Sequence, residues 1–204
     1  MWLINVHNGI KEQGINPINI DDYPTIKNHL DKYFSELEKR QDKGDSPYNL
    51  RNCAYMEDFF RPKIIFQEMV QEPSFMIDES NNFMCLDTGR IIVGENLIFL
   101  LAILNSKLFF YAIKNFYGGG SLGESGVRMK HPFFEKFNCV VPSVKQKEII
   151  EMLTKQRIKL KENSFSTEEI EKKIDKLIYS LYKINSHEMI TIEGQNLQLF
   201  QFRH

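Results

Sequence analysis

The sequence predicts an α+β fold: a small mixed sheet with a buried helix, followed by C-terminal helices. Strand-like segments gather in the middle of the chain and helix-like segments near its ends, without the regular alternation of a parallel α/β protein. One helix-like segment, 95–117, is apolar around most of its circumference up to Asn105, which is typical of a buried helix. With 204 residues, of which 42% are hydrophobic, the chain is long enough to build a core around it.

The N-terminal part of the chain is expected to hold one long helix. Residues 1–20 look like a short strand, a turn and irregular chain. Residues 22–43 carry apolar side chains at helical spacing, and Asp22 and Pro24 suit the start of a helix, where the missing N–H of proline costs little. Gly44 is expected to end this helix, and a polar, aromatic linker follows it.

The middle of the chain is expected to form the sheet and its buried helix. The β-rich run 64–66 is the first strand. Residues 74–94 read as two or three short strands separated by turns. The buried helix at 95–117, capped by Asn96, then leads through a glycine-rich loop into a strand expected at 137–141.

Two amphipathic helices are expected after the sheet. The first is 144–162, and the second is expected to begin with a capping box of Ser166 and Glu169. The tail after them is mixed in composition. We therefore expect a domain formed by 1–143 and a helical spacer segment, 144–204, that packs on it.

Composition and charge exclude several classes of protein. The formal net charge is −1, so nucleic-acid binding needs a local basic patch. The three cysteines lack the C-x-x-C pairs of a zinc ribbon and suit a reducing cytosol, and the five histidines are isolated from one another. The longest apolar run, 97–104, is far shorter than the ~20 residues that span a bilayer. We expect a cytoplasmic protein without a membrane segment, and the opening residues suggest a fragment of a longer chain.

The most unusual segment is the glycine-rich loop 118–131, which holds five of the eleven glycines. It lacks the G-x-x-x-x-G-K-[ST] pattern of a phosphate-binding loop, and the order helix, loop, strand is wrong for one. A flexible connection is the simplest interpretation. However, Arg128, Lys130 and His131 close the loop, and the stretch 105–136 holds five cations and two carboxylates. Such a local patch can contact phosphates with lysine and read guanine with arginine.

A second pair of cations lies at the entrance of the first strand, where Arg61 and Lys63 flank Pro62. Each alone is more simply a solvated charge at a strand edge, but with the loop they suit phosphate contacts. No serine stands in a nucleophile elbow and no cysteine has a base nearby, so no catalytic or metal-binding residue is expected. The candidate DNA-contacting residues are Arg61, Lys63, Lys114, Tyr117, Gly119, Ser121, Arg128, Lys130 and His131.

Several short motifs follow one another in a specific order. They are Tyr23–Pro24, Glu38–Arg40, Pro62–Ile65, Leu104–Leu108, Val140–Pro142, Gln146–Lys147 and Ile174–Tyr182. This order resembles the C-terminal specificity domain of TaqI-like and related type IIG restriction–modification enzymes. The resemblance runs from about residue 20 to residue 190.

The resemblance implies recognition of a DNA target, by a domain that lies downstream of an adenine-N6 methyltransferase in the same polypeptide. The parent enzymes use S-adenosylmethionine, with Mg²⁺ expected where they also cleave DNA. The Asn-Pro-Pro-Tyr signature is missing here, since Asn16–Pro17 is followed by Ile18–Asn19, without the aromatic that stacks on a flipped base. No cofactor is therefore expected in this chain, and its expected partners are double-stranded DNA and the methyltransferase or nuclease domain of the parent.

Three functions stay open on the sequence. The first is a DNA target-recognition domain. The second is a catalytic fragment with methyltransferase or nuclease activity of its own. The third is a subunit-docking module that does not touch DNA and whose terminal helices pair with another subunit through residues such as Leu177 and Leu181. The alternative for those helices is that their apolar faces simply pack on their own domain.

Overall fold

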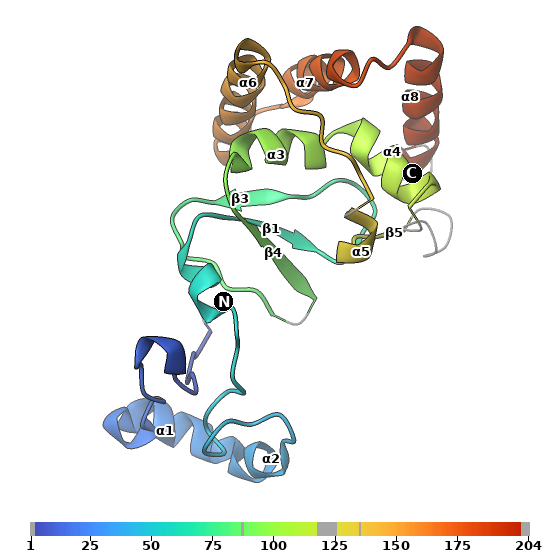
Figure 1. Ribbon diagram of the computed structural model, residues 1–204. Helices are drawn as coiled ribbons and strands as arrows, with labels where there is room; N and C mark the ends of the chain where they lie inside the picture. The colour runs from blue at the N-terminus through green and yellow to red at the C-terminus, as the bar shows by residue number, and fades with distance from the viewer. Residues whose placement is uncertain (1–2, 87, 118–125, 135, 201–204) are drawn as a thin grey trace. The chain divides into compact units, whose positions relative to one another are not determined.

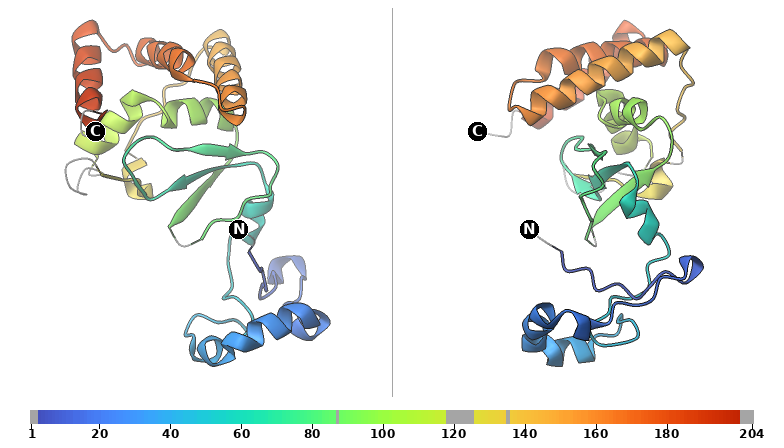
Figure 2. Two further views of the ribbon diagram at one scale, coloured as in Figure 1. Left: turned by 180° about the vertical axis from the view of Figure 1, so that it is seen from behind. Right: turned by 90° about the vertical axis from the view of Figure 1, so that its left-hand side faces the viewer.

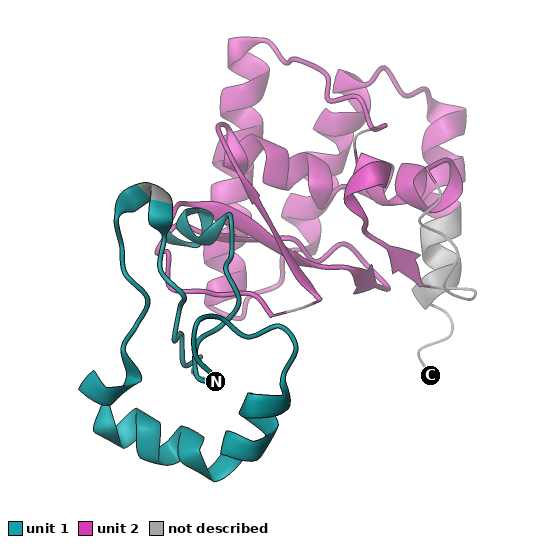
Figure 3. Cartoon of the chain, turned by 60° about the horizontal axis from the view of Figure 1, so that its bottom comes forward, with its two compact units in different colours: residues 1–60 teal, residues 61–204 magenta. Residues whose placement is uncertain are grey.

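The computed structural model describes residues 3–86, 88–117, 126–134 and 136–200. The chain divides into two compact units, Met1–Phe60 and Arg61–His204 (Figure 3). The expected boundary at residue 143 does not coincide with this division, because the helices after it pack against the buried helix of the second unit.

The first unit contains two short helices, α1 (Pro24–Leu30) and α2 (Phe34–Lys39), joined by a single 3-10 turn. The one helix expected at 22–43 is therefore wrong in its continuity and in its end. The chain leaves the helix at Arg40, whose guanidinium donates to the carbonyl oxygens of Pro47 and Asn49 at 3.2 and 2.8 Å. These two bonds hold the returning chain beside the helix end.

Buried asparagines organise the loops of the first unit. Asn8 is 8% exposed, and its amide nitrogen donates to two side chains in the segment 45–52. Asn49 is 3% exposed and donates to two backbone carbonyls in the segment 7–18. The described residues 3–20 contain an isolated bridge instead of the short strand expected there, so the loops depend on these side-chain bonds.

The second unit is built on a three-stranded sheet in the order β3-β1-β4 (Figure 1). Ile64 and Phe66, on one face of β1, are 0% and 6% exposed. The α+β class and the small sheet are confirmed. The sheet is not mixed, however, because β3 and β4 both pair with β1 in antiparallel orientation. The strands are β1 (Lys63–Gln67), β3 (Met76–Asp78) and β4 (Gly89–Val93).

A second sheet pairs β2 (Met69–Val70) with β5 (Val127–Arg128). β5 falls inside the segment expected to be a loop, and the short helix α5 (His131–Phe134) follows it. The strand expected at 137–141 is wrong, since these described residues are irregular. They are held instead by Tyr182, whose hydroxyl accepts from the backbone N–H of Val140 at 3.4 Å.

The buried helix is confirmed, but it is broken into α3 (Leu97–Leu104) and α4 (Lys107–Asn115), which meet at 60°. Asn105 causes the break, because its side chain exchanges hydrogen bonds with both backbone groups of Phe75, at 2.9 and 3.1 Å. Ser106 then starts α4 by accepting from the N–H of Phe109 at 3.1 Å. The side chain of Asn96 does not cap α3 as expected and accepts from Lys147 instead.

No single helix among the described residues is long and apolar enough to cross a membrane, although α3 and α4 pass such a test as a bent pair.

Helix α3 lies between two apolar cores, which explains why it is apolar on every side. Figure 2 shows it with the sheet on one side and α6 (Val144–Glu162) and α7 (Glu168–Leu181) on the other. Its Leu97, Leu101 and Leu104 belong to the core over the sheet. Its Phe99, Ala102 and Ile103 belong to the core beneath the C-terminal helices.

The C-terminal helices are α6 (Val144–Glu162), α7 (Glu168–Leu181) and α8 (Ser186–Phe200). The first two are confirmed, whereas α8 was not expected in the mixed tail. A capping box forms at Ser143 and Gln146, while α7 begins without a side-chain cap. The apolar face of α7 is buried in the second core, and its Leu181 is only 8% exposed. This face therefore packs on its own unit and is not available to another subunit.

Candidate nucleic-acid interface

The segment 127–130 is an alternating run of apolar and cationic side chains. Val127 and Met129 are 0% and 1% exposed, and they enter the core over the sheet. Arg128 and Lys130 therefore project from the opposite side, because side chains alternate along extended chain. The backbone N–H of Met129 donates to the carbonyl oxygen of Glu68 at 2.6 Å. The two cations are thus carried on anchored backbone.

One carboxylate, Glu68, connects the cations of this surface. Its Oε2 lies 2.7 Å from Nη2 of Arg90, and its Oε1 lies 4.0 Å from both Nε of Arg128 and Nζ of Lys130. We call these four residues the Glu68 cluster. Three cations and one carboxylate leave it two net positive charges.

The cations of the Glu68 cluster are accessible to a ligand. The side chains of Arg90, Arg128 and Lys130 are 47, 36 and 43% exposed, whereas that of Glu68 is 21% exposed. Nε of Arg128 is buried and makes no hydrogen bond within the described part of the chain. An anion arriving at this surface therefore meets positively charged donors before it meets the carboxylate.

Lys63 lies elsewhere and has a structural role. Its side chain is 0% exposed, and Nζ lies 2.6 Å from Oδ2 of Asp78, which is also 0% exposed. Asp78 in turn accepts from both the N–H and the hydroxyl of Ser80 and from the N–H of Phe83. A phosphate cannot reach Lys63 without breaking this pair, so we withdraw Lys63 from the expected DNA contacts.

The remaining expected residues surround the Glu68 cluster only in part. Lys114 and Tyr117 are half-buried on and just after α4, which packs against β5. The exposed His131 begins α5, directly after Lys130. Gly119 and Ser121 lie outside the described residues.

Arg61 is exposed but lies at the other end of β1 from Glu68. β1 lies between the two, and seven residue steps of largely extended chain, at about 3.3 Å each, separate them by roughly 23 Å. The structure therefore does not bring Arg61 into the Glu68 cluster.

Arg90 and Glu68 were missed by sequence reasoning. Arg90 joins the cluster because β4 pairs with β1 in a register that sets it opposite Phe66, two residues before Glu68. Sequence spacing does not reveal this register. The alternation at 127–130, in contrast, is visible in the sequence and would have shown that the loop ends in a strand.

The Glu68 cluster has the charge and exposure that suit the binding of an anion. Burial raises the pKa of the Cys85 and Cys139 thiols, which disfavours the nucleophilic thiolate. Within the described residues, no group of three or more histidine, cysteine or acidic side chains lies close enough to hold a metal ion. Charged donors on and beside strands β4 and β5 are suited to phosphate oxygens and base edges.

Two of the motifs singled out in the sequence meet in space. Oδ1 of Asp175, in the motif 174–182, accepts from the backbone N–H of Lys107, in the motif 104–108, at 3.0 Å. The carboxylate thus binds the N-terminus of α4 from α7, across a separation of 68 residues.

A scan against models of known protein families finds no match to the chain.

Proposed function

We propose that the chain is the sequence-specific DNA target-recognition domain of a type II restriction–modification enzyme. The observation that carries the proposal is the alternation at 127–130, which buries Val127 and Met129 and turns Arg128 and Lys130 outward. Because Arg90 joins them from β4, cations from two strands converge on one exposed surface. The resemblance of the motifs to the specificity domains of such enzymes supports the same assignment.

The residues of the Glu68 cluster are suited to different contacts with DNA. Lysine binds phosphate as a point charge, whereas the planar guanidinium of arginine can donate two parallel bonds to a guanine edge. Lys130 is therefore assigned to the DNA backbone, and Arg128 and Arg90 to base edges or phosphates. Glu68 binds Arg90 directly and attracts Arg128 from 4.0 Å until a DNA phosphate replaces it.

The chemistry of the parent enzyme is assigned to another part of the protein. Adenine-N6 methylation with S-adenosylmethionine, and Mg²⁺-dependent cleavage where it occurs, would take place in the methyltransferase or nuclease domain, in the cytoplasm. The chain by itself is therefore expected to bind double-stranded DNA and to transfer no methyl group from S-adenosylmethionine.

Binding to a mixed-sequence duplex, followed by fluorescence anisotropy, tests the proposal. Arg128→Ala and Lys130→Ala are each expected to weaken binding about fivefold or more. Lys176→Ala, which removes an exposed cation from α7, is the matched control and is expected to leave binding unchanged. Equal losses in all three variants would show that the Glu68 cluster is not the DNA-binding surface.

A further inference from the structure

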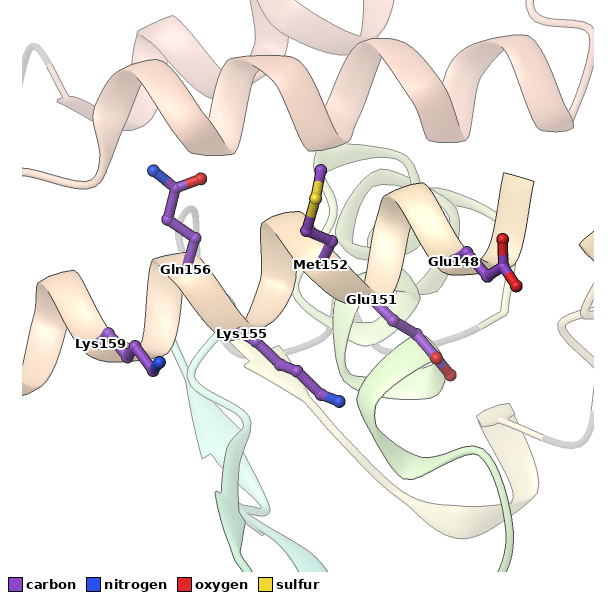
Figure 4. A pocket seen from close by; sticks show the side chains of 6 residues that line it. All are labelled: Glu148, Glu151, Met152, Lys155, Gln156 and Lys159. Atoms are coloured by element: carbon purple, nitrogen blue, oxygen red, sulfur yellow. The ribbon is translucent and has the colours of Figure 1, made fainter. Parts of the chain in front are cut away.

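The outward face of α6 is a stripe of charged residues with one methionine at its middle. Figure 4 shows six side chains of this helix around a shallow hollow, with Met152 between Glu148 and Gln156. The stripe is exposed along its length, and Met152 is 60% exposed. In order, its residues are Lys145, Glu148, Met152, Lys155, Lys159 and Glu162.

The charges of this stripe are complementary to those of the same stripe in reverse order. A two-fold axis midway between Met152 and Lys155 sets Lys145 opposite the partner's Glu162 and Glu148 opposite the partner's Lys159. The symmetry repeats both pairs, which gives four attractive pairs in all. In a parallel arrangement, each of these side chains would instead face its own copy, which is repulsive.

The apolar side chains around α6 follow the same symmetry. Val141 and Val144, at the start of α6, are 90% and 75% exposed, and Phe165, just after its end, is 66% exposed. The antiparallel arrangement brings the valines of one copy next to the partner's Phe165. Met152 lies near the axis, opposite the aliphatic part of the partner's Lys155 and about 4.5 Å along the helix from the partner's Met152. Large exposed apolar groups thus meet at both ends and at the centre of the helix.

We propose that α6 pairs with α6 of a second copy of this chain in an antiparallel, two-fold arrangement. The 19-residue helix is about 28 Å long, so the interface is small and the dimer dissociates readily. Charge order supplies the register, and the apolar side chains supply contact area. The pairing uses neither the buried face of α7 nor the Glu68 cluster, so it does not depend on DNA binding.

Charge reversal on the exposed stripe tests the pairing without disturbing the core. Glu148→Lys and Lys159→Glu each replace two attractive pairs by repulsive ones, and each is expected to raise the dimer dissociation constant about tenfold or more. The two positions are 11 residues apart on one helix, about 16 Å, so they do not contact each other within a monomer. Restored association in the double variant E148K/K159E can therefore come only from contacts between copies.

Mixing the two single variants distinguishes pairing between copies from any effect within one copy. A chain with Glu148→Lys and a chain with Lys159→Glu repel their own kind but attract each other, so sedimentation velocity is expected to show dimers in the mixture alone. Glu169→Lys, on α7, is the matched control and is expected to associate like the wild type. Circular dichroism checks that every variant keeps its helix content. The pairing is refuted if the wild type stays monomeric up to about 1 mM, or if the mixture associates no better than its components.

Discussion

Replacing Lys63 by methionine is expected to destabilise the second unit by about 3–5 kcal/mol, because it leaves the buried carboxylate of Asp78 without its cation. The two side chains are both 0% exposed and 2.6 Å apart, so solvent does not screen the pair. Asp78 also holds the turn that follows β3 through Ser80 and Phe83, so an unpaired Asp78 affects that turn as well.

The acid sensitivity of this pair gives an independent magnitude. Burial alone would raise the pKa of Asp78, but the hydrogen bonds from Lys63, Ser80 and Phe83 outweigh it and lower the pKa from 3.8 to about 2. The folded state thus favours the carboxylate, which contributes about 2.5 kcal/mol at neutral pH. This contribution is present above pH 3.8 and is lost as the pH falls through about 2. Without the lysine, acid unfolding is expected to begin at a higher pH.

Urea unfolding followed by circular dichroism measures the effect. The double variant K63M/D78N is expected to be more stable than K63M, since it removes the unpaired charge, and the resulting cycle gives a coupling energy of about 1 kcal/mol or more. If Lys63→Met left the stability unchanged but abolished DNA binding, the structural assignment of Lys63 would be wrong and the lysine would be a DNA contact.

Three further variants test other parts of the structure. Burial raises the pKa of Asp175 to about 6, so the stability of the wild type falls as the pH rises from about 4 to about 6. Asp175→Asn keeps an acceptor for the N–H of Lys107 and should flatten this fall in thermal melts. An unchanged pH profile of the melting temperature would contradict this prediction. Glu68→Gln removes the negative charge of the Glu68 cluster and should tighten binding to a mixed-sequence duplex about threefold by anisotropy; weaker binding would oppose this. Ser143→Ala removes the capping box of α6 and should cost about 1 kcal/mol in urea unfolding, whereas no loss would show that the cap is unimportant.

The elements that depend on local pattern could be predicted from the sequence, and those that depend on distant partners could not. Apolar side chains around most of the circumference of the segment 95–117, up to Asn105, predict a buried helix, because that part of the segment has almost no polar side to expose to water. The break at Asn105 depends on hydrogen bonds to Phe75, which lies 30 residues earlier in the chain. No local signal marks such a partner, since asparagine is also common in helix caps.

In the candidate site, too, residues with a local signal could be predicted and residues that depend on distant partners could not. Arg128 and Lys130 could be identified because they end a glycine-rich segment on a nearly neutral chain. Lys63 was misassigned because its partner, Asp78, is brought to it by the register of β1 with β3. Arg90 was overlooked because it reaches the Glu68 cluster through the register of β1 with β4. Strand register decides which charges are buried and which meet, and it is fixed by the whole sheet.

The measurement that tests the central claim most directly is the salt dependence of DNA binding. Counterion release makes the logarithm of the binding constant fall with the logarithm of the salt concentration, by about 0.9 for each phosphate neutralised. If the Glu68 cluster docks on the DNA backbone, the variant R128Q/K130Q should have a smaller slope than the wild type, by about 1 if only Lys130 contacts a phosphate and by about 2 if Arg128 does so too. Lys176→Gln should keep the wild-type slope. A slope that is the same in all three proteins, or wild-type binding that does not respond to salt, would contradict the account.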